Sequence, residues 1–269
     1  MDISRAKTIL IVSFLILNIF LGFRLWQRPQ YMHLSGGLTA NEMELAKTTL
    51  SEAGYQVLAS IPNQVPRLSL LHVARPATDE AAWINKFWGE DKKTGNENLE
   101  ILANGLVVFS KQSDEKVNTK EGKRQLVELF LCERGVCEDD LQFDMSFPLG
   151  NGYELFTYVQ TYEGFPLFTS FVQVKIGQEG VAEVRINRVI PLEFADKEIQ
   201  GVSALVAVNT LVQQPGDFIN KTIVDISLGY YSKDYDAKRW EIVPAWRFAA
   251  SDGSVFYVNA LNGEVEEIM

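Results

Sequence analysis

The sequence has few of the side chains that most enzymes and metal sites need. It holds only two cysteines and two histidines among 269 residues. A structural zinc site needs four suitable ligands, and a catalytic nucleophile needs a base that activates it. No G-x-S-x-G, H-E-x-x-H, P-loop or G-x-G-x-x-G motif occurs. We therefore predict no catalytic residue, metal ligand or cofactor, although a carboxylate pair among the 35 acidic residues stays open.

Positive charge is also scarce. The chain carries 25 Lys and Arg against 35 Asp and Glu, a net charge of −10. Nucleic-acid binding depends on basic patches, and a domain lying on anionic lipid needs them too. The composition therefore argues against a nucleic-acid partner.

One long apolar stretch stands out near the start of the chain. Residues 8–26 carry a single charge, Arg24, and would form about 28 Å of helix, close to the ~30 Å hydrocarbon core of a bilayer. The stretch ends in GFRLWQRPQ, without the small-residue cleavage site of a signal peptide. We expect an uncleaved transmembrane anchor, with residues 1–7 in the cytoplasm and the bulk of the chain outside.

One face of this predicted helix carries a polar and a small residue. Ile11, Leu15, Asn18 and Gly22 recur at three- and four-residue steps. Asn seeks a partner in lipid, and Gly permits close helix approach. The face is therefore a candidate partner-binding surface; the alternative is that one Asn and one Gly are tolerated without a role.

The remainder is predicted to be an α+β protein. After a linker at 27–38, helices are expected near residues 40, 120 and 202, each followed by short strands. We predict three helix-plus-antiparallel-sheet modules, at 39–115, 116–195 and 196–269, with the last two most alike. Within the first module, Asn104-Gly105 predicts a type I′ hairpin turn.

Several polar and aromatic residues have two interpretations. Cys132 and Cys137 form either a disulfide or two separate buried thiols. His72, among leucines, is expected to be a core residue, and the acidic run 138–140 a solvated surface. Aromatic residues crowd the last two modules; most should build the core, although an outward set could form a protein contact surface.

Three stretches carry a family resemblance. MDISRAKTILIVSFLILNIFLGFRLW resembles the anchor of the YycI (WalI) family, mainly through Lys7-Thr8-Ile9 and FLILNIFL. YVQTYEGFPLFTSFVQVKIGQEGVAEV and VPAWRFAASDGSVFYVNALNGEV are similar to PepSY-like modules. The resemblance extends along the chain.

The resemblance implies regulation rather than catalysis. Proteins of this family accompany the sensor histidine kinase WalK (YycG) and a sister protein, YycH. The resemblance implies that the outer modules associate with the sister protein and that the membrane helix contacts the kinase. It also implies that the output of the kinase affects cell-wall metabolism. An extracytoplasmic ligand- or peptide-binding module without kinase contact is the alternative.

Overall fold

The structure is a computed structural model that divides into two parts, Met1–Gly36 and Gly37–Met269. In the first part it describes only Phe14 and Asn18. In the second part it describes Glu44, Lys47, Thr48, 51–52, 54, 56–62, 67–77, 79–88, 97–111, 120–213, 221–233 and 237–268. The fold presented below is that of the second part.

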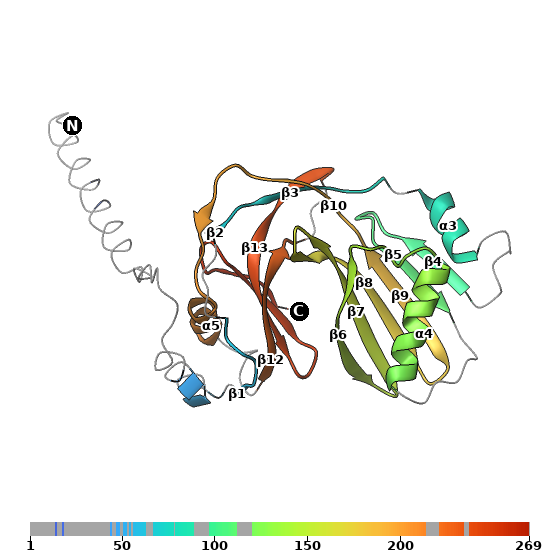
Figure 1. The fold of residues 1–269 in the computed structure, drawn as a ribbon, viewed down its shortest axis with the longest axis horizontal. Helices are drawn as coiled ribbons and strands as arrows, with labels where there is room; N and C mark the ends of the chain where they lie inside the picture. Colours follow the sequence, from blue (N-terminus) through green and yellow to red (C-terminus); the bar gives the residue numbers. More distant parts are fainter. Residues whose placement is uncertain are drawn as a thin grey trace, which may run out of the picture. The chain divides into compact units, whose positions relative to one another are not determined.

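Helices occur near residues 120 and 202, as the sequence predicts (Figure 1). The helix predicted near residue 40 lies mostly outside the described residues, although Glu44, Lys47, Thr48 and residues 51–52 are helical. The helices are α3 (Glu80–Trp88), α4 (Lys120–Glu133) and α5 (Ala204–Val212). The first strands are β1 (Gln56–Val57), β2 (Arg67–Leu68), β3 (Leu71–Ala74), β4 (Glu97–Ile101) and β5 (Val107–Lys111). The next are β6 (Leu141–Gly150), β7 (Tyr153–Tyr162), β8 (Phe165–Gly177), β9 (Gly180–Asn187), β10 (Ile190–Phe194) and β11 (Ile199–Gln200). The last are β12 (Thr222–Tyr231), β13 (Arg239–Ala250), β14 (Val255–Asn259) and β15 (Val265–Ile268).

Two antiparallel meanders dominate the strand pairing. One runs β6-β7-β8-β9 and the other β12-β13-β14-β15, each with neighbouring strands paired in chain order. We call the first meander with α4 the α4 subdomain, and the second with α5 the α5 subdomain. The predicted class of helices with antiparallel sheets is confirmed in this coarse form. Two pairings are parallel instead, β1 with β12 and β8 with β12, and the second joins the subdomains at Leu167 and Tyr230.

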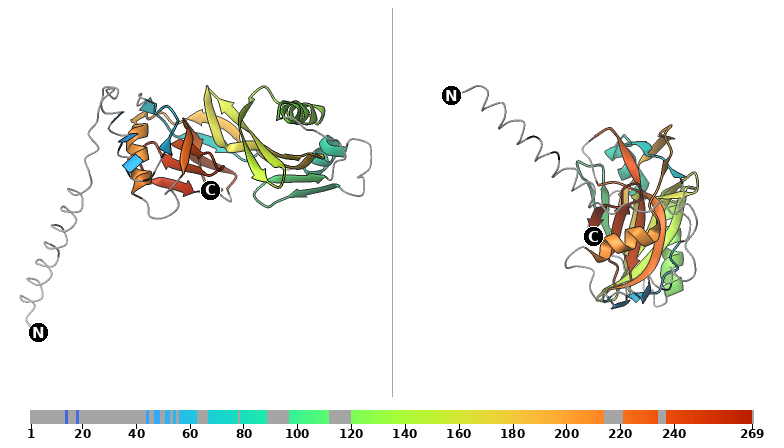
Figure 2. Two further views of the ribbon diagram at one scale, coloured as in Figure 1. Left: turned by 90° about the horizontal axis from the view of Figure 1, so that it is seen from below. Right: turned by 90° about the vertical axis from the view of Figure 1, so that its left-hand side faces the viewer.

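In the α4 subdomain, the helix packs on one face of the sheet (Figure 2). Leu131 and Val127 of α4 are buried against apolar residues of the strands, including Val172 and Val184. These strand residues alternate with more exposed ones, as expected for a sheet with one buried face. Burial of this apolar face, at about 25 cal/mol per Å², is what holds α4 in place.

In the α5 subdomain, the helix begins at the N-cap Ser203, whose side chain accepts a hydrogen bond from the Val206 N–H at 3.3 Å. Ala204, Ala207, Val208 and Leu211 are buried against Trp246, Phe248, Phe256 and other strand residues. The Trp246 indole donates to the Val202 carbonyl at 2.9 Å. This bond satisfies a polar group that burial would otherwise leave unpaired.

Residues of the range 39–115 complete the cores of both subdomains. Ala59, Ile61 and Leu68 pack into the α5 core, whereas Phe87 and Phe109 pack into the α4 core. Strand β3 pairs with β13, and β5 pairs with β9. Among the described residues, this range shows no buried apolar cluster of its own. The boundaries of the three predicted modules stay a prediction.

The hairpin turn at Asn104-Gly105 differs from the predicted type. A type I′ turn needs positive φ at both central residues, but here only Gly105 has it, at 83°. The Gly105 N–H donates to Leu102 O at 2.8 Å, and the Leu102 N–H to Leu106 O at 2.9 Å. This pattern is a three-residue loop ending in a glycine bulge. Positive φ at both positions occurs instead at Asn151-Gly152 and Glu163-Gly164.

Candidate functional site

A buried arginine joins the two subdomains. Arg247 of β13 is only 5% exposed, and its Nη1 and Nη2 donate to the two carboxylate oxygens of Asp144 in β6, at 2.5 and 2.9 Å. Its Nη2 also donates to Asp225 at 3.1 Å, and its Nε to the Ser227 hydroxyl at 3.1 Å. A bidentate pair with further hydrogen bonds is the geometry in which a buried ion pair offsets its desolvation cost.

Two β-bulges bring the acidic partners of Arg247 into place. The register of β6 against β7 shifts between Phe143 and Met145, which leaves Asp144 as the extra residue. The register of β12 against β13 shifts just before Asp225. A bulge re-aims side chains out of the regular alternation. Backbone irregularity therefore positions the acidic side chains at this joint.

Aromatic rings surround the guanidinium group. Arg247 Cζ lies 4.4 Å from the centroid of the Phe168 ring in β8, and Tyr257 contacts both Phe168 and a stacked Tyr231. Burial lowers the pKa of Arg247, but hydrogen bonding and charge from Asp144 outweigh it and raise the pKa above its ordinary value. For Tyr257, by contrast, burial raises the pKa of the hydroxyl. Arg247, its acidic partners and these rings thus form one ionic and aromatic contact, in which the guanidinium is charged; we call it the ionic joint.

The contacts around Arg247 show where the outward-facing aromatic residues of the two meanders lie. Phe168, Tyr231 and Tyr257 point away from the helix-covered cores, yet each is at most 5% exposed. Each subdomain covers the outward rings of the other. These three residues therefore form an internal contact rather than an exposed protein contact surface.

A second polar network crosses the same junction. Ser170 Oγ donates to Gln160 Oε1 at 2.6 Å, and Gln160 Nε2 donates to Asp140 at 2.8 Å. Asn187 Nδ2 donates to the Thr169 carbonyl at 2.8 Å. The Thr169 hydroxyl accepts from the Ser232 N–H at 2.8 Å, and Trp240 Nε1 donates to Ser232 Oγ at 3.0 Å. These two sets of bonds are linked through the backbone, because Thr169 and Ser170 are neighbours in β8. Together they extend from Asp140 in the α4 subdomain to β13 in the α5 subdomain.

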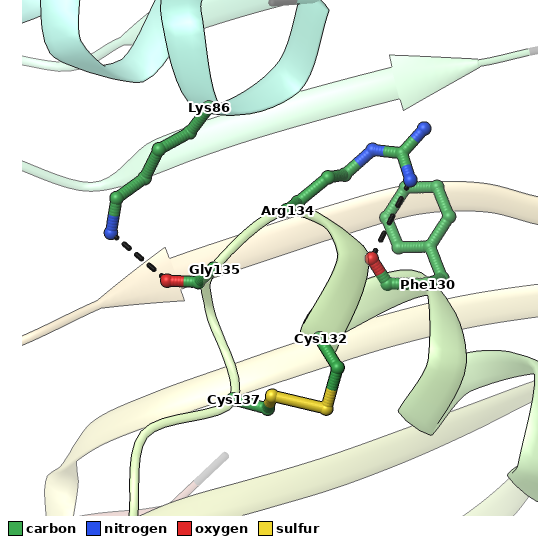
Figure 3. The surroundings of a disulfide bond; sticks show 6 residues. All are labelled: Lys86, Phe130, Cys132, Arg134, Gly135 and Cys137. Atoms are coloured by element: carbon green, nitrogen blue, oxygen red, sulfur yellow. Dashed lines mark hydrogen bonds between the residues drawn. A yellow bond between two sulfur atoms is a disulfide. The ribbon is translucent and has the colours of Figure 1, made fainter.

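Cys132 and Cys137 form a disulfide at the end of α4 (Figure 3). Their Cα atoms lie 4.7 Å apart, and both residues are exposed. Between them, Lys86 Nζ of α3 donates to Gly135 O at 3.1 Å, and Arg134 Cζ lies 3.7 Å from the Phe130 ring centroid. The pair is bonded and at the surface, unlike the alternative of two separate buried thiols.

The proposed membrane face lies almost entirely outside the described residues. Ile11, Leu15 and Gly22 are not described, whereas Asn18 is helical and exposed, as is Phe14 four residues earlier. Across the described residues, no helix combines the length and apolar character needed to cross a bilayer. The partner-binding role of Ile11, Leu15, Asn18 and Gly22 stays a prediction.

One expectation for a polar residue needs correction. His72 is not a core residue, because it alternates with buried Leu71 and Val73 on β3 and its side chain is 38% exposed, 3.7 Å from Glu241. The acidic run 138–140 lies at the surface as expected, with Glu138 and Asp139 exposed, and Glu138 and Asp140 both accept hydrogen bonds from Arg188, at 2.7 and 2.8 Å. In the parts of the chain that the structure describes, no group of three or more His, Cys, Asp or Glu is placed to hold a metal ion.

The ionic joint was missed by sequence reasoning, although a signal was present. Arg247 interrupts the apolar run PAWRFAA, and Asp144 interrupts LQFDMSF. A charged residue within an apolar strand is almost never buried unless it is paired. These two interruptions could have been matched as partners, but the bulges that bring them together leave no recognisable pattern.

The features above define a class of α+β protein, in which two helix-and-meander subdomains are joined by the buried ion pair of Arg247 and Asp144. A model of the YycI protein family matches residues 39–261, and the chain belongs to that family. Among solved structures, YycH from Bacillus subtilis is similar, with 13% identity, 81% of this chain and 60% of the YycH chain covered, and a TM-score of 0.51.

A second similar structure is the Bacillus megaterium YpeB C-terminal domain. It has 14% identity and a TM-score of 0.42, with 72% of this chain and 98% of that domain covered. A comparison with curated protein sequences found no match. At these identities, the YycH similarity shows a shared fold.

Proposed function

We propose that this chain is a membrane-anchored extracytoplasmic regulator that acts on the sensor histidine kinase WalK together with a YycH-type sister protein, and so affects cell-wall metabolism. The observation that carries the proposal is the YycI family match over residues 39–261. The YycH-like fold supports it, since a regulator and its sister protein would share one architecture.

In this proposal residues 1–7 are cytoplasmic, 8–26 cross the membrane, 27–38 form a linker and the remainder lies outside. The face with Ile11, Leu15, Asn18 and Gly22 contacts the kinase helices. Polar and packing contacts between membrane helices contribute about 0.6–2 kcal/mol each. A bias of about 1.4 kcal/mol shifts a two-state kinase equilibrium tenfold. One helix face is therefore enough to modulate kinase output.

The test is copurification of WalK and the sister protein with this chain from membranes. Native chain is compared with one whose residues 8–26 are replaced by an unrelated apolar helix of equal length. We expect the sister protein to copurify with both chains, and the kinase to copurify only with the chain that has the native anchor. Kinase capture by both chains would assign recognition to the outer region. Capture by neither would contradict the proposal and favour a ligand- or peptide-binding module.

A matched pair of point variants sharpens the result. Asn18→Leu changes the proposed face, whereas Ser13→Leu places the same side chain on the opposite face of a helix with 3.6 residues per turn. We expect Asn18→Leu to lower the yield of kinase and Ser13→Leu to leave it unchanged. Equal losses would show that the anchor acts through its general apolar character.

A further inference from the structure

The disulfide lies over a helix end that is already capped. Gly135 has φ +60°, its N–H donates to Cys132 O at 3.0 Å, and the Val136 N–H donates to Leu131 O at 2.9 Å. This pair of bonds is the Schellman motif, which satisfies the last carbonyls of a helix. Val136 and Leu131 are both buried. The backbone therefore holds the turn as far as Val136 without the help of the S–S bond, whereas Cys137, directly after it, is tied to the helix end by that bond.

The position of the pair also limits what the bond contributes to stability. The ring that it closes is short, with a sequence separation of five, and short rings restrain the unfolded chain least. Lys86, which lies outside the ring, donates a hydrogen bond to Gly135 O (Figure 3). Within the ring, the buried side chain of Val136 also holds the turn in place. Both sulfur-bearing residues face solvent. An exposed bond of low structural value is open to thiol attack.

The chain directly after Cys137 connects the pair to the junction. Glu138 and Asp140 bind Arg188, and the Asp140 carbonyl accepts from the Thr161 N–H at 2.7 Å. Asp140 also accepts from Gln160, the first member of the network that reaches Ser232 and Trp240. Freeing Cys137 therefore loosens the segment that anchors this network.

We propose that Cys132–Cys137 is a thiol–disulfide exchange site whose reactant is an extracytoplasmic protein dithiol, and that its reduction is sensed at the subdomain junction. The location outside the cytoplasm rests on the proposed function. One thiolate of the dithiol attacks a cysteine sulfur, the S–S bond breaks, and the other cysteine leaves as a thiolate that takes up a proton. The second thiol then displaces the bound cysteine. Two electrons pass to this chain, which gains two thiols, while the reactant becomes a disulfide.

The first test measures reduction of the folded, full-length chain in detergent by dithiothreitol and by a reduced thioredoxin-type protein. Thiols are alkylated and counted by mass. We expect reduction to rise with reductant concentration and to run at least about 100-fold faster than global unfolding, because an exposed bond needs no opening of the fold. A rate that equals the unfolding rate at every reductant concentration would overturn the proposal. The Cys132→Ser/Cys137→Ser variant should retain a cooperative unfolding transition; a variant that does not fold would also contradict it.

The second test follows the Trp240 indole N–H by NMR, identified with Trp240→Phe. Its hydrogen bond to Ser232 lies at the far end of the network, whereas Trp246 donates to Val202 in the α5 core and serves as the control. We expect reduction to move the Trp240 signal and not the Trp246 signal, and Gln160→Leu to abolish that response. An unmoved Trp240 signal in the native sequence would refute sensing at the junction. Both tests use the chain without a kinase, so their outcome is independent of copurification.

Discussion

The α4 and α5 subdomains have the same order of elements, but their helices are covered differently. On α4, Arg124, Gln125 and Leu129 are exposed, whereas on α5 only Asn209 is. Ala59, Ile61 and Leu68, from a segment far earlier in the chain, are buried in the same apolar cluster as α5 and help to cover it. Their sequences already differ in this way, since KRQLVELFLCE is amphipathic and ALVAVNTLV is apolar almost all round. A helix that is apolar all round is a buried helix.

The two sheets differ in burial in the same way as the two helices, with the strands of the α5 subdomain more completely buried. Strand β9 alternates between buried and more exposed residues, but seven successive residues at the end of β13 are all buried. The face of β13 that points away from α5 is covered at the junction, where Arg247 meets Asp144. The α5 subdomain thus depends on its neighbours on both sides, and the α4 subdomain depends on them less. Four predictions test this difference.

The largest effect is expected at the junction. Asp144→Ala leaves the guanidinium of Arg247 buried without its bidentate partner, which costs about 3–5 kcal/mol of unfolding free energy. Asp225→Ala, at a side chain that is 45% exposed, should cost about 1 kcal/mol or less. Urea unfolding at pH 7 measures both. Equal small losses would show that the ion pair does not join the subdomains, and Arg247→Met with Asp144→Leu should recover much of the larger loss.

Loss of the cover over α5 is the next largest effect. Leu68 is 2% exposed in the α5 core, whereas Leu129 on α4 is 56% exposed. Leu68→Ala should destabilise the protein by about 3 kcal/mol through lost burial and a cavity, and Leu129→Ala should change stability by no more than about 0.5 kcal/mol. Thermal and urea unfolding compare the pair. If Leu68→Ala behaved like Leu129→Ala, α5 would be covered by its own sheet alone.

The sequence predicts the local elements well and the long-range contacts poorly. Helix ends and meander strands follow from periodicity, and from glycine stops such as Gly135. The packing of Ile61 on α5 and the pairing of β3 with β13 join segments over 140 residues apart, and no local pattern encodes them. Even the Asn104-Gly105 turn was predicted in place but not in type, because the Asn104 side chain accepts from the Leu106 N–H and stabilises the wider loop.

High pH should destabilise both subdomains through one buried tyrosine in each. Burial raises the pKa of Tyr158, with Glu128 adding to it, and the pKa of Tyr230, each to about 12. Above pH 10 the unfolded chain releases protons that the folded chain keeps, so stability is complete below pH 10 and falls as the pH rises toward 12. We expect a loss of about 1 kcal/mol per tyrosine between pH 9 and pH 11, which grows to about 3 kcal/mol above pH 12. Urea midpoints at pH 9 and pH 11 measure it, and Tyr158→Phe or Tyr230→Phe should each flatten the dependence. An unchanged slope in both variants would contradict the assignment.

The smallest expected effect separates these two tyrosines by sign at pH 7. Tyr158 lies beneath α4, 5% exposed, and its hydroxyl has no hydrogen-bond partner among the described residues. The Tyr230 hydroxyl donates to the Ser69 carbonyl at 2.9 Å. Because a buried unpaired hydroxyl is costly and a paired one is stabilising, Tyr158→Phe should raise the free energy of unfolding by about 1 kcal/mol and Tyr230→Phe should lower it by about as much. Each substitution removes the same atom, so the other variant is its control. A loss of stability in Tyr158→Phe would mean that this hydroxyl is hydrogen-bonded to solvent or to a partner. The buried polar groups of the α4 subdomain would then be as fully hydrogen-bonded as those of the α5 subdomain.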